Sequence, residues 1–230
     1  MISTWSCLRE GIDTLVRRFP LLLGAWLVLL AVQQVIDLVA PAVGPRAWLN
    51  VLLSVALLAP LYAGQYYLVL RVVRNEPAAF RDLFQGFGYW VPVAGVQVLT
   101  LLTVAAGFLL LVIPAIIFAV MFAWASIVVL DPLTGSESRP RIGPVEAMRR
   151  SKELTAGYRG TLFGISLLLS LPLIVLMIAV SISSASPNVT IPLWAIELFA
   201  LLSGTLFLGP LHAASYMVAY DAVTRLKRVE

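Results

Sequence analysis

The sequence predicts an all-α membrane protein with six transmembrane helices and three amphipathic helices on the cytoplasmic side. Two observations lead to this fold class. Of the 230 residues, 60% are hydrophobic and only 12% are charged, against about 25% charged residues in a soluble domain. In addition, residues 91–130 contain no Asp, Glu, Lys or Arg. Because one crossing needs roughly 20 apolar residues, we expect this stretch to form a tight helical hairpin within the bilayer.

Six apolar segments are each long enough to cross a bilayer at about 1.5 Å per residue, although the fourth is barely so. The first exceeds the roughly 7–15 apolar residues of a signal-peptide core, so we expect it to be retained as a helix. The expected spans are residues 20–40, 49–70, 91–111, 114–130, 161–182 and 198–220.

Basic residues lie almost entirely on one side of these spans. Fifteen of the 16 Lys and Arg residues precede the first span or follow the second, fourth and sixth, and only Arg46 lies on the other side. Because cytoplasmic loops are rich in Lys and Arg, the sequence predicts a multi-pass protein with both termini in the cytoplasm. The loops on the opposite side are short, which excludes a folded domain there.

Each of the first three cytoplasmic segments carries apolar residues at helical spacing. Such a pattern in a basic segment is typical of a helix that lies in the headgroup region. The apolar sets are Ile2, Trp5, Leu8, Ile12, Leu15, Val16 and Phe19 in the first segment, Phe80, Leu83, Phe84 and Phe87 in the second, and Val145, Met148, Leu154 and Tyr158 in the third.

An amphipathic helix followed by a hairpin thus occurs three times in a single membrane domain (residues 1–230), in residues 1–70, 71–130 and 131–222. Gly24, Gly95 and Gly164 lie just inside the first helix of each hairpin. Residues 59–66 also parallel residues 209–216, with Pro, Leu, Ala and Tyr matching at an offset of 150. Since each unit returns to the same side, the repeats would be parallel, around an axis along the membrane normal. Chance remains an alternative, since the chain has 15 glycines.

Residues 143–157 read Gly-Pro-Val-Glu-Ala-Met-Arg-Arg-Ser-Lys-Glu-Leu-Thr-Ala-Gly. This segment resembles one found in the YciC-like bacterial membrane proteins and in the membrane domain fused to some glycerophosphodiester phosphodiesterases. Residues 60–64 and 82–87 are similar to the same group. The resemblance covers most of the chain and implies a six-helix protein of the bacterial inner membrane with no assigned biochemical role. The phosphodiesterase chemistry belongs to a separate soluble domain, so the resemblance implies no such activity here.

Motifs of common catalytic sites are missing from the sequence. A single histidine precludes H-E-x-x-H, and neither G-x-S-x-G nor a G-K-[ST] phosphate loop occurs. The single cysteine, Cys7, cannot form an intramolecular disulfide or a zinc site alone. We therefore expect a protein that is not an enzyme and has no catalytic residues, no cofactor and no metal site. Nucleic acid is not an expected partner, because the basic residues flank apolar spans.

Two sets of residues are candidates for function. Arginine grips phosphate bidentately, and the candidate contacts to anionic inner-leaflet headgroups or a protein partner are Arg17, Arg18, Arg139, Arg141, Arg149, Arg150 and Lys152. Polar groups within a bilayer are costly, and the candidates for an intramembrane polar path are Gln65, Tyr66, Gln97 and His212. Hydrogen bonds between helices explain the second set equally well. Asp37 and Glu197 could form a cation site or be hydrated at the interface.

The function predicted from these observations is a non-catalytic inner-membrane scaffold or accessory protein that engages inner-leaflet lipids and cytosolic or membrane partners. The alternative is a transporter or lipid flippase with a path between the helical repeats. A tightly packed centre would argue against the alternative.

Overall fold

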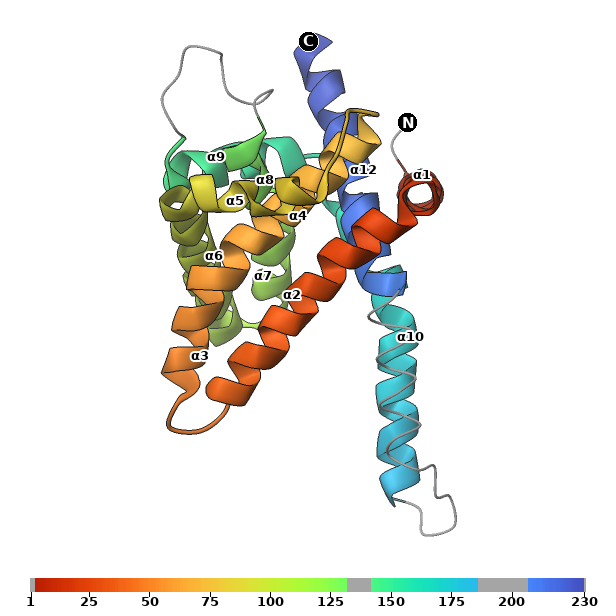
Figure 1. Ribbon diagram of the computed structural model, residues 1–230. Coiled ribbons are helices and arrows are strands. Elements are labelled where there is room, and N and C mark those ends of the chain that lie inside the picture. Colours follow the sequence, from red (N-terminus) through yellow and green to blue (C-terminus); the bar gives the residue numbers. More distant parts are fainter. Residues whose placement is uncertain (1–2, 132–141, 186–206, 230) are drawn as a thin grey trace.

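The structure, a computed structural model, describes residues 3–131, 142–185 and 207–229 (Figure 1). Within these ranges the chain is helical and has no strand. Five helical segments in them are long and apolar enough to cross a membrane, which indicates a multi-pass membrane protein. They are Phe19–Val39, Ala47–Val73, Trp90–Leu110, Val112–Leu130 and Arg159–Leu176. Residues 198–206, the first part of the sixth expected span, lie outside the described residues.

Short helices alternate with these spanning segments. The first span is α2 (Phe19–Val39), the second joins α3 (Ala47–Leu53), the π-helical turn η1 (Ser54–Leu58) and α4 (Ala59–Val73), the third is α6 (Trp90–Leu110), and the fourth joins α7 (Val112–Met121) and α8 (Ala125–Leu130). The fifth lies in α10 (Arg159–Ala185). The other described elements are α1 (Thr4–Arg17), the 3-10 turn η2 (Phe80–Phe84), α5 (Gln85–Gly88), α9 (Pro144–Thr155) and α12 (Gly209–Val229).

Both ends of the chain lie at one end of the bundle, together with α1 and α9, at the top of Figure 1. We call this the basic end, because the last residues of α4 and α12, the first of α10 and much of α9 carry arginines there. The hairpin of residues 91–130 is formed by α6, α7 and α8. Its turn is at Leu111, where the backbone is extended.

The π-helical turn in the second span has an identifiable cause. Pro60 has no N–H and cannot bond the carbonyl of Ala56, and the helix widens to η1 immediately before it. The indole N–H of Trp90, at the start of α6, donates to this carbonyl at 2.8 Å. Because an unpaired carbonyl is costly in hydrocarbon, this bond compensates the proline and holds α6 against the second span.

The fourth span is interrupted between α7 and α8, and α9 covers the interruption. The carbonyl of Met121, at the end of α7, accepts hydrogen bonds from Ser151 Oγ at 2.9 Å and Thr155 Oγ1 at 3.3 Å. Both donors are buried and lie on α9. The short amphipathic helix therefore satisfies a backbone carbonyl that the broken span cannot satisfy itself.

The expected apolar residues of α9 lie in different surroundings. Met148 is buried, whereas Val145 is 70% exposed. The buried side instead combines Met148 with Ala147 and the two hydroxyl residues that bond Met121. Small and polar side chains allow the close approach that these hydrogen bonds need, which apolar periodicity alone does not reveal.

The backbones of α4 and η2–α5 touch at two glycines. A methyl group on Gly64 would overlap the carbonyl oxygen of Leu83, and one on Gly86 would overlap that of Pro60. Leu83 is fully buried in this contact, while Phe80, Phe84 and Phe87 around it are exposed. The second amphipathic segment therefore packs on the second span through the buried side chain of Leu83 and the close backbone contacts at Gly64 and Gly86.

The short elements and the spanning helices make contacts in a closed ring. Each of three glycines near the start of a spanning helix lies against the first residue of a short element at the basic end. The pairs are Gly24 with Phe80, Gly95 with Pro144 and Gly164 with Thr4. The short elements also pack on the second helix of another hairpin: η2 on α4, α9 on α8, and α1 on α12.

Candidate functional site

The structure divides the apolar residues of α1 between two surfaces. Leu8 and Leu15 are buried where α1 packs on α12. The face expected to lie in the headgroup region is thus used partly for packing within the protein. Trp5, Ile12 and Val16 are 74%, 48% and 70% exposed, and they leave an apolar surface on a helix at the basic end.

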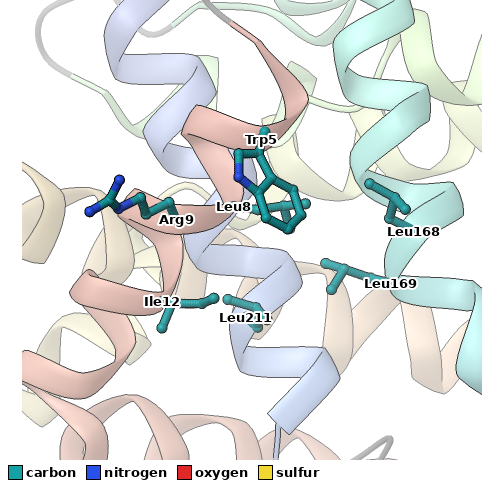
Figure 2. Close-up of a pocket in the computed structure, with 7 residues that line it drawn as sticks. All are labelled: Trp5, Leu8, Arg9, Ile12, Leu168, Leu169 and Leu211. Carbon is teal, nitrogen blue, oxygen red and sulfur yellow. The ribbon is translucent and has the colours of Figure 1, made fainter.

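A groove opens between α1, α10 and α12 (Figure 2). Its volume of about 530 Å³ lies within the roughly 300–1,000 Å³ of typical small-molecule sites. It is lined by Trp5, Leu8, Arg9 and Ile12 of α1, Leu168 and Leu169 of α10, and Leu211 of α12. All of these side chains are apolar except that of Arg9. The groove is therefore apolar, and Arg9 is the one charged residue among those that line it.

Arg9 lies at the edge of this groove, on the opposite side of Trp5 from Leu168 and Leu169 (Figure 2). Its side chain is exposed and forms no hydrogen bond or ion pair with any described residue. Sequence reasoning missed it as a candidate, because Arg9 was grouped with the general basic flank of the first span. Only the packing of α10 and α12 against α1 places apolar walls beside it.

The predicted headgroup contacts divide into two groups. Arg17 and Arg18 lie at the end of α1, where Arg17 donates to Asn75 Oδ1 at 3.0 Å and Arg18 is exposed. Arg149, Arg150 and Lys152 lie on α9. Arg139 and Arg141 lie outside the described residues.

On α9 the two arginines are engaged by one carboxylate. Arg149 makes two hydrogen bonds to Glu146, both at 2.9 Å, and Arg150 makes one at 3.1 Å. The hydrogen bonds from Arg149 and then Arg150 lower the pKa of the Glu146 carboxyl to about 2. The hydrogen bond to Glu146 likewise raises the pKa of Arg149. An anion that binds here must compete with Glu146, so α9 is a weaker phosphate site than its sequence suggests.

The four predicted residues of the polar path lie in different surroundings. Gln65 is 1% exposed, and its Oε1 has no hydrogen-bond donor among the described residues. Tyr66 and His212 are half-buried, whereas Gln97 is exposed. No hydrogen bond between described residues joins Gln97 to the other three.

A small polar cluster does surround His212. Its Nε2 lies 3.3 Å from Ser166 Oγ, and the same hydroxyl lies 2.6 Å from the Tyr216 hydroxyl. The centroids of the His212 and Tyr216 rings are 4.3 Å apart. Ser166 belongs to α10, so this cluster joins two helices, which agrees with the alternative of interhelical hydrogen bonding.

The most extensive polar network was not anticipated from the sequence. Arg74, at the end of the second span, pairs with Asp131 through two hydrogen bonds of 2.8 and 2.9 Å and with Asp221 through one of 2.8 Å. Tyr220 donates to Asp131 at 3.1 Å, and Arg225 pairs with Asp221 at 2.7 Å. The Arg74 side chain is 7% exposed and that of Asp131 is 0% exposed.

This network joins the ends of α4 and α8 to α12 at the basic end. Burial alone would lower the pKa of the Arg74 guanidinium, but its hydrogen bonds to Asp131 and Asp221 outweigh burial and raise it. A signal for the network was available: Arg74, Asp131 and Asp221 each lie close to the end of an apolar run. Position along the chain alone does not show that these three residues meet, because they are 57 to 147 positions apart.

At the opposite end of the bundle, Asp37 accepts hydrogen bonds of 2.8 Å from both Gln33 and Asn50. Asn50 also donates to the Ala40 carbonyl at 2.6 Å. These bonds fasten the turn between α2 and α3. Glu197, the other residue of the suggested cation site, lies outside the described residues.

The chain matches no protein-family model, no curated protein and no solved structure.

Proposed function

We propose that this chain is a non-catalytic scaffold or accessory protein of a bacterial inner membrane, which engages inner-leaflet lipids and a cytosolic or membrane partner through its basic end. The observation that carries the proposal is the exposed apolar surface of α1, formed by Trp5, Ile12 and Val16. A helix at the end of a membrane bundle with such a surface and unpaired arginines suits the headgroup region. The partition of Lys and Arg supports a cytoplasmic basic end.

The proposal includes a sixth span that ends in α12, and three parallel units. The ring of contacts supports the units, because in each case the short element of one unit begins at a glycine of another. The buried network adds to this support. Arg74 and Asp131 directly follow α4 and α8, the second helices of the first two hairpins, and Asp221 lies within α12. The network therefore joins α4, α8 and α12, as expected if these helices surround one axis. The resemblance to the YciC-like group belongs to the same proposal. It rests mainly on residues 143–157, and residues 60–64 and 82–87, which add to it, contain Gly64 and Gly86 of the close backbone contact.

The lipid content of the purified chain tests this proposal. The chain is extracted in mild detergent, and its bound phospholipid is quantified per molecule and by headgroup. We expect anionic phospholipid to be enriched over the membrane extract, and the enrichment to fall when Trp5, Ile12 and Val16 are all replaced by serine. Val43→Ser is the matched control, because Val43 is 87% exposed but lies in the turn at the opposite end. Bound lipid with the composition of the extract would contradict the proposal.

The transporter or flippase alternative starts from the polar cluster of Ser166, His212 and Tyr216 between α10 and α12, which interhelical hydrogen bonding explains equally well. The buried network speaks against it, because paired charges and the fully buried rings of Trp124 and Tyr220 fill the bundle at the basic end. His212→Ala separates the two. Lipid binding unchanged in this variant agrees with the scaffold, and loss of substrate or lipid movement in reconstituted vesicles would favour the transporter.

A further inference from the structure

We propose that the groove between α1, α10 and α12 is a binding site for a single anionic phospholipid, with an acyl chain against its leucines and the phosphate on Arg9. This inference rests on the proposed function and deepens it, since it assigns one place and one chemical class to the lipid. The shared chemistry is a phosphate attached to an apolar chain. The occupant is a membrane lipid from the leaflet at the basic end, not a soluble phosphate.

The walls of the groove suit a hydrocarbon chain. Leu8 and Leu169 are buried at its base, while Trp5, Ile12 and Leu168 are exposed around it. Covering exposed apolar surface is favourable by about 25 cal/mol per Å², and a flexible chain can follow a groove that three helices form. Trp5 has the amphipathic ring that is common at membrane interfaces.

Exposed apolar residues follow the groove along α10. Leu171, Val175 and Ile178 are exposed and continue from Leu168 at helical spacing along one side of this helix. An acyl chain that enters the groove can therefore extend along α10 without crossing a polar surface. A soluble phosphate or nucleotide gains nothing from such a path.

The charge of Arg9 selects the headgroup. A guanidinium donates several hydrogen bonds in a planar arrangement that matches phosphate oxygens. Unlike Arg149 and Arg150, which bond Glu146, Arg9 has no acidic partner among the described residues. An incoming phosphate therefore displaces no existing ion pair. Near a membrane surface one such cation contributes about 1 kcal/mol toward an anionic lipid.

Quenching of Trp5 fluorescence tests the site directly. The full-length chain in detergent micelles is titrated with phosphatidylglycerol whose acyl chains carry bromine, which quenches nearby indoles. The same titration with brominated phosphatidylcholine tests the charge preference. The chain has six tryptophans, so the difference between wild type and Trp5→Phe isolates the Trp5 signal.

We expect saturable quenching of Trp5 at a phosphatidylglycerol mole fraction about fivefold lower than for phosphatidylcholine. Arg9→Gln should remove this preference. Arg18→Gln should retain it, because Arg18 is equally exposed and cationic but does not line the groove. Leu168→Phe, whose larger ring narrows the groove without adding an indole, should weaken quenching by both lipids, and inorganic phosphate should not compete.

Three results would overturn the site. The first is an equal loss of preference in Arg9→Gln and Arg18→Gln, which would mean a diffuse charge effect and would leave the proposed function intact. The second is the absence of Trp5-dependent quenching at any mole fraction, which would mean that no lipid occupies the groove. The third is equal binding of the two lipids by the wild-type chain. The proposed function fails separately, if the purified chain enriches no anionic lipid at all.

Discussion

Replacing Arg74 with methionine should lower the free energy of unfolding by about 3–5 kcal/mol, the usual cost of removing one partner from a buried ion pair. Arg74 donates three hydrogen bonds of 2.8–2.9 Å to two carboxylates. Each charged hydrogen bond is worth about 1.5–3 kcal/mol, and the cost of burying the guanidinium offsets part of that sum. The loss is large because the buried carboxylate of Asp131 loses its two hydrogen bonds from Arg74.

Thermal unfolding of the purified chain in mild detergent measures this effect. For a domain of this size, 1 kcal/mol corresponds to a change in Tm of about 2–4 °C, so Arg74→Met should lower Tm by roughly 6–20 °C. Arg74→Lys should cost less, because it keeps the charge and loses only the bidentate geometry. Arg81→Met is the matched control, since Arg81 is exposed and forms no ion pair with a described residue, and it should leave Tm nearly unchanged.

A second substitution separates the network from a general packing effect. Adding Asp131→Asn to Arg74→Met removes the buried negative charge of Asp131 and should recover part of the lost stability. A Tm for Arg74→Met equal to that of Arg81→Met would refute the reasoning. A double variant that loses the full sum of the two single losses would refute it as well, because the two residues would then act independently.

Three further predictions concern a glycine contact, an ion pair on α9 and the accessibility of cysteines. Gly64→Ala should lower the free energy of unfolding by about 1–3 kcal/mol, the usual cost of overpacking, because the added methyl group meets the backbone carbonyl of Leu83. Gly88 lies in open space, so Gly88→Ala should leave Tm nearly unchanged. Equal losses of stability in the two variants would contradict the contact. The hydrogen bonds from Arg149 and Arg150 lower the pKa of Glu146 from 4.5 to about 2. Their contribution to stability is therefore complete above about pH 4.5 and is lost as the pH falls toward 2. Between these pH values the Tm of the wild type should fall by more than the Tm of Glu146→Gln. Cys7 should resist thiol reagents even in opened vesicles, because it is buried and burial raises the pKa of its thiol; a cysteine replacing Arg46 in a Cys7→Ala background should instead react from outside intact cells, and its protection there would reverse the proposed orientation.

Five of the six expected spans correspond, to within a few residues, to helices that are long and apolar enough to cross a membrane. Residues 91–111 were expected to cross, and α6 covers Trp90–Leu110. This works because hydrocarbon requires each crossing to be long, apolar and internally hydrogen-bonded, so composition alone marks it. The same constraint explains the least regular crossing: the barely sufficient length of residues 114–130 corresponds to the span that breaks between α7 and α8.

The candidate site was less accessible to sequence reasoning. Arg9, Arg74 and Arg149 look alike in the sequence, each being an arginine in a segment that flanks an expected apolar span. In the structure Arg9 has no partner among the described residues, Arg74 is buried between two aspartates, and Arg149 bonds a carboxylate three residues away. Only the last relation follows from helical spacing. The other two depend on residues more than 50 positions apart.

By itself, the sequence determined that this is a helical, multi-pass membrane protein, and it predicted that the basic residues gather at one end. These properties follow from hydropathy and charge along the chain, which need no knowledge of neighbours. The tertiary structure decided how the short helices are used. Ser151 and Thr155 satisfy a broken span, Gly64 and Gly86 let two backbones meet, and α1 leaves a groove beside Arg9. Each of these three features depends on which surfaces pack together. The role of a hydroxyl group, a glycine or an unpaired arginine is set by the atoms that it contacts, and these come from distant parts of the chain.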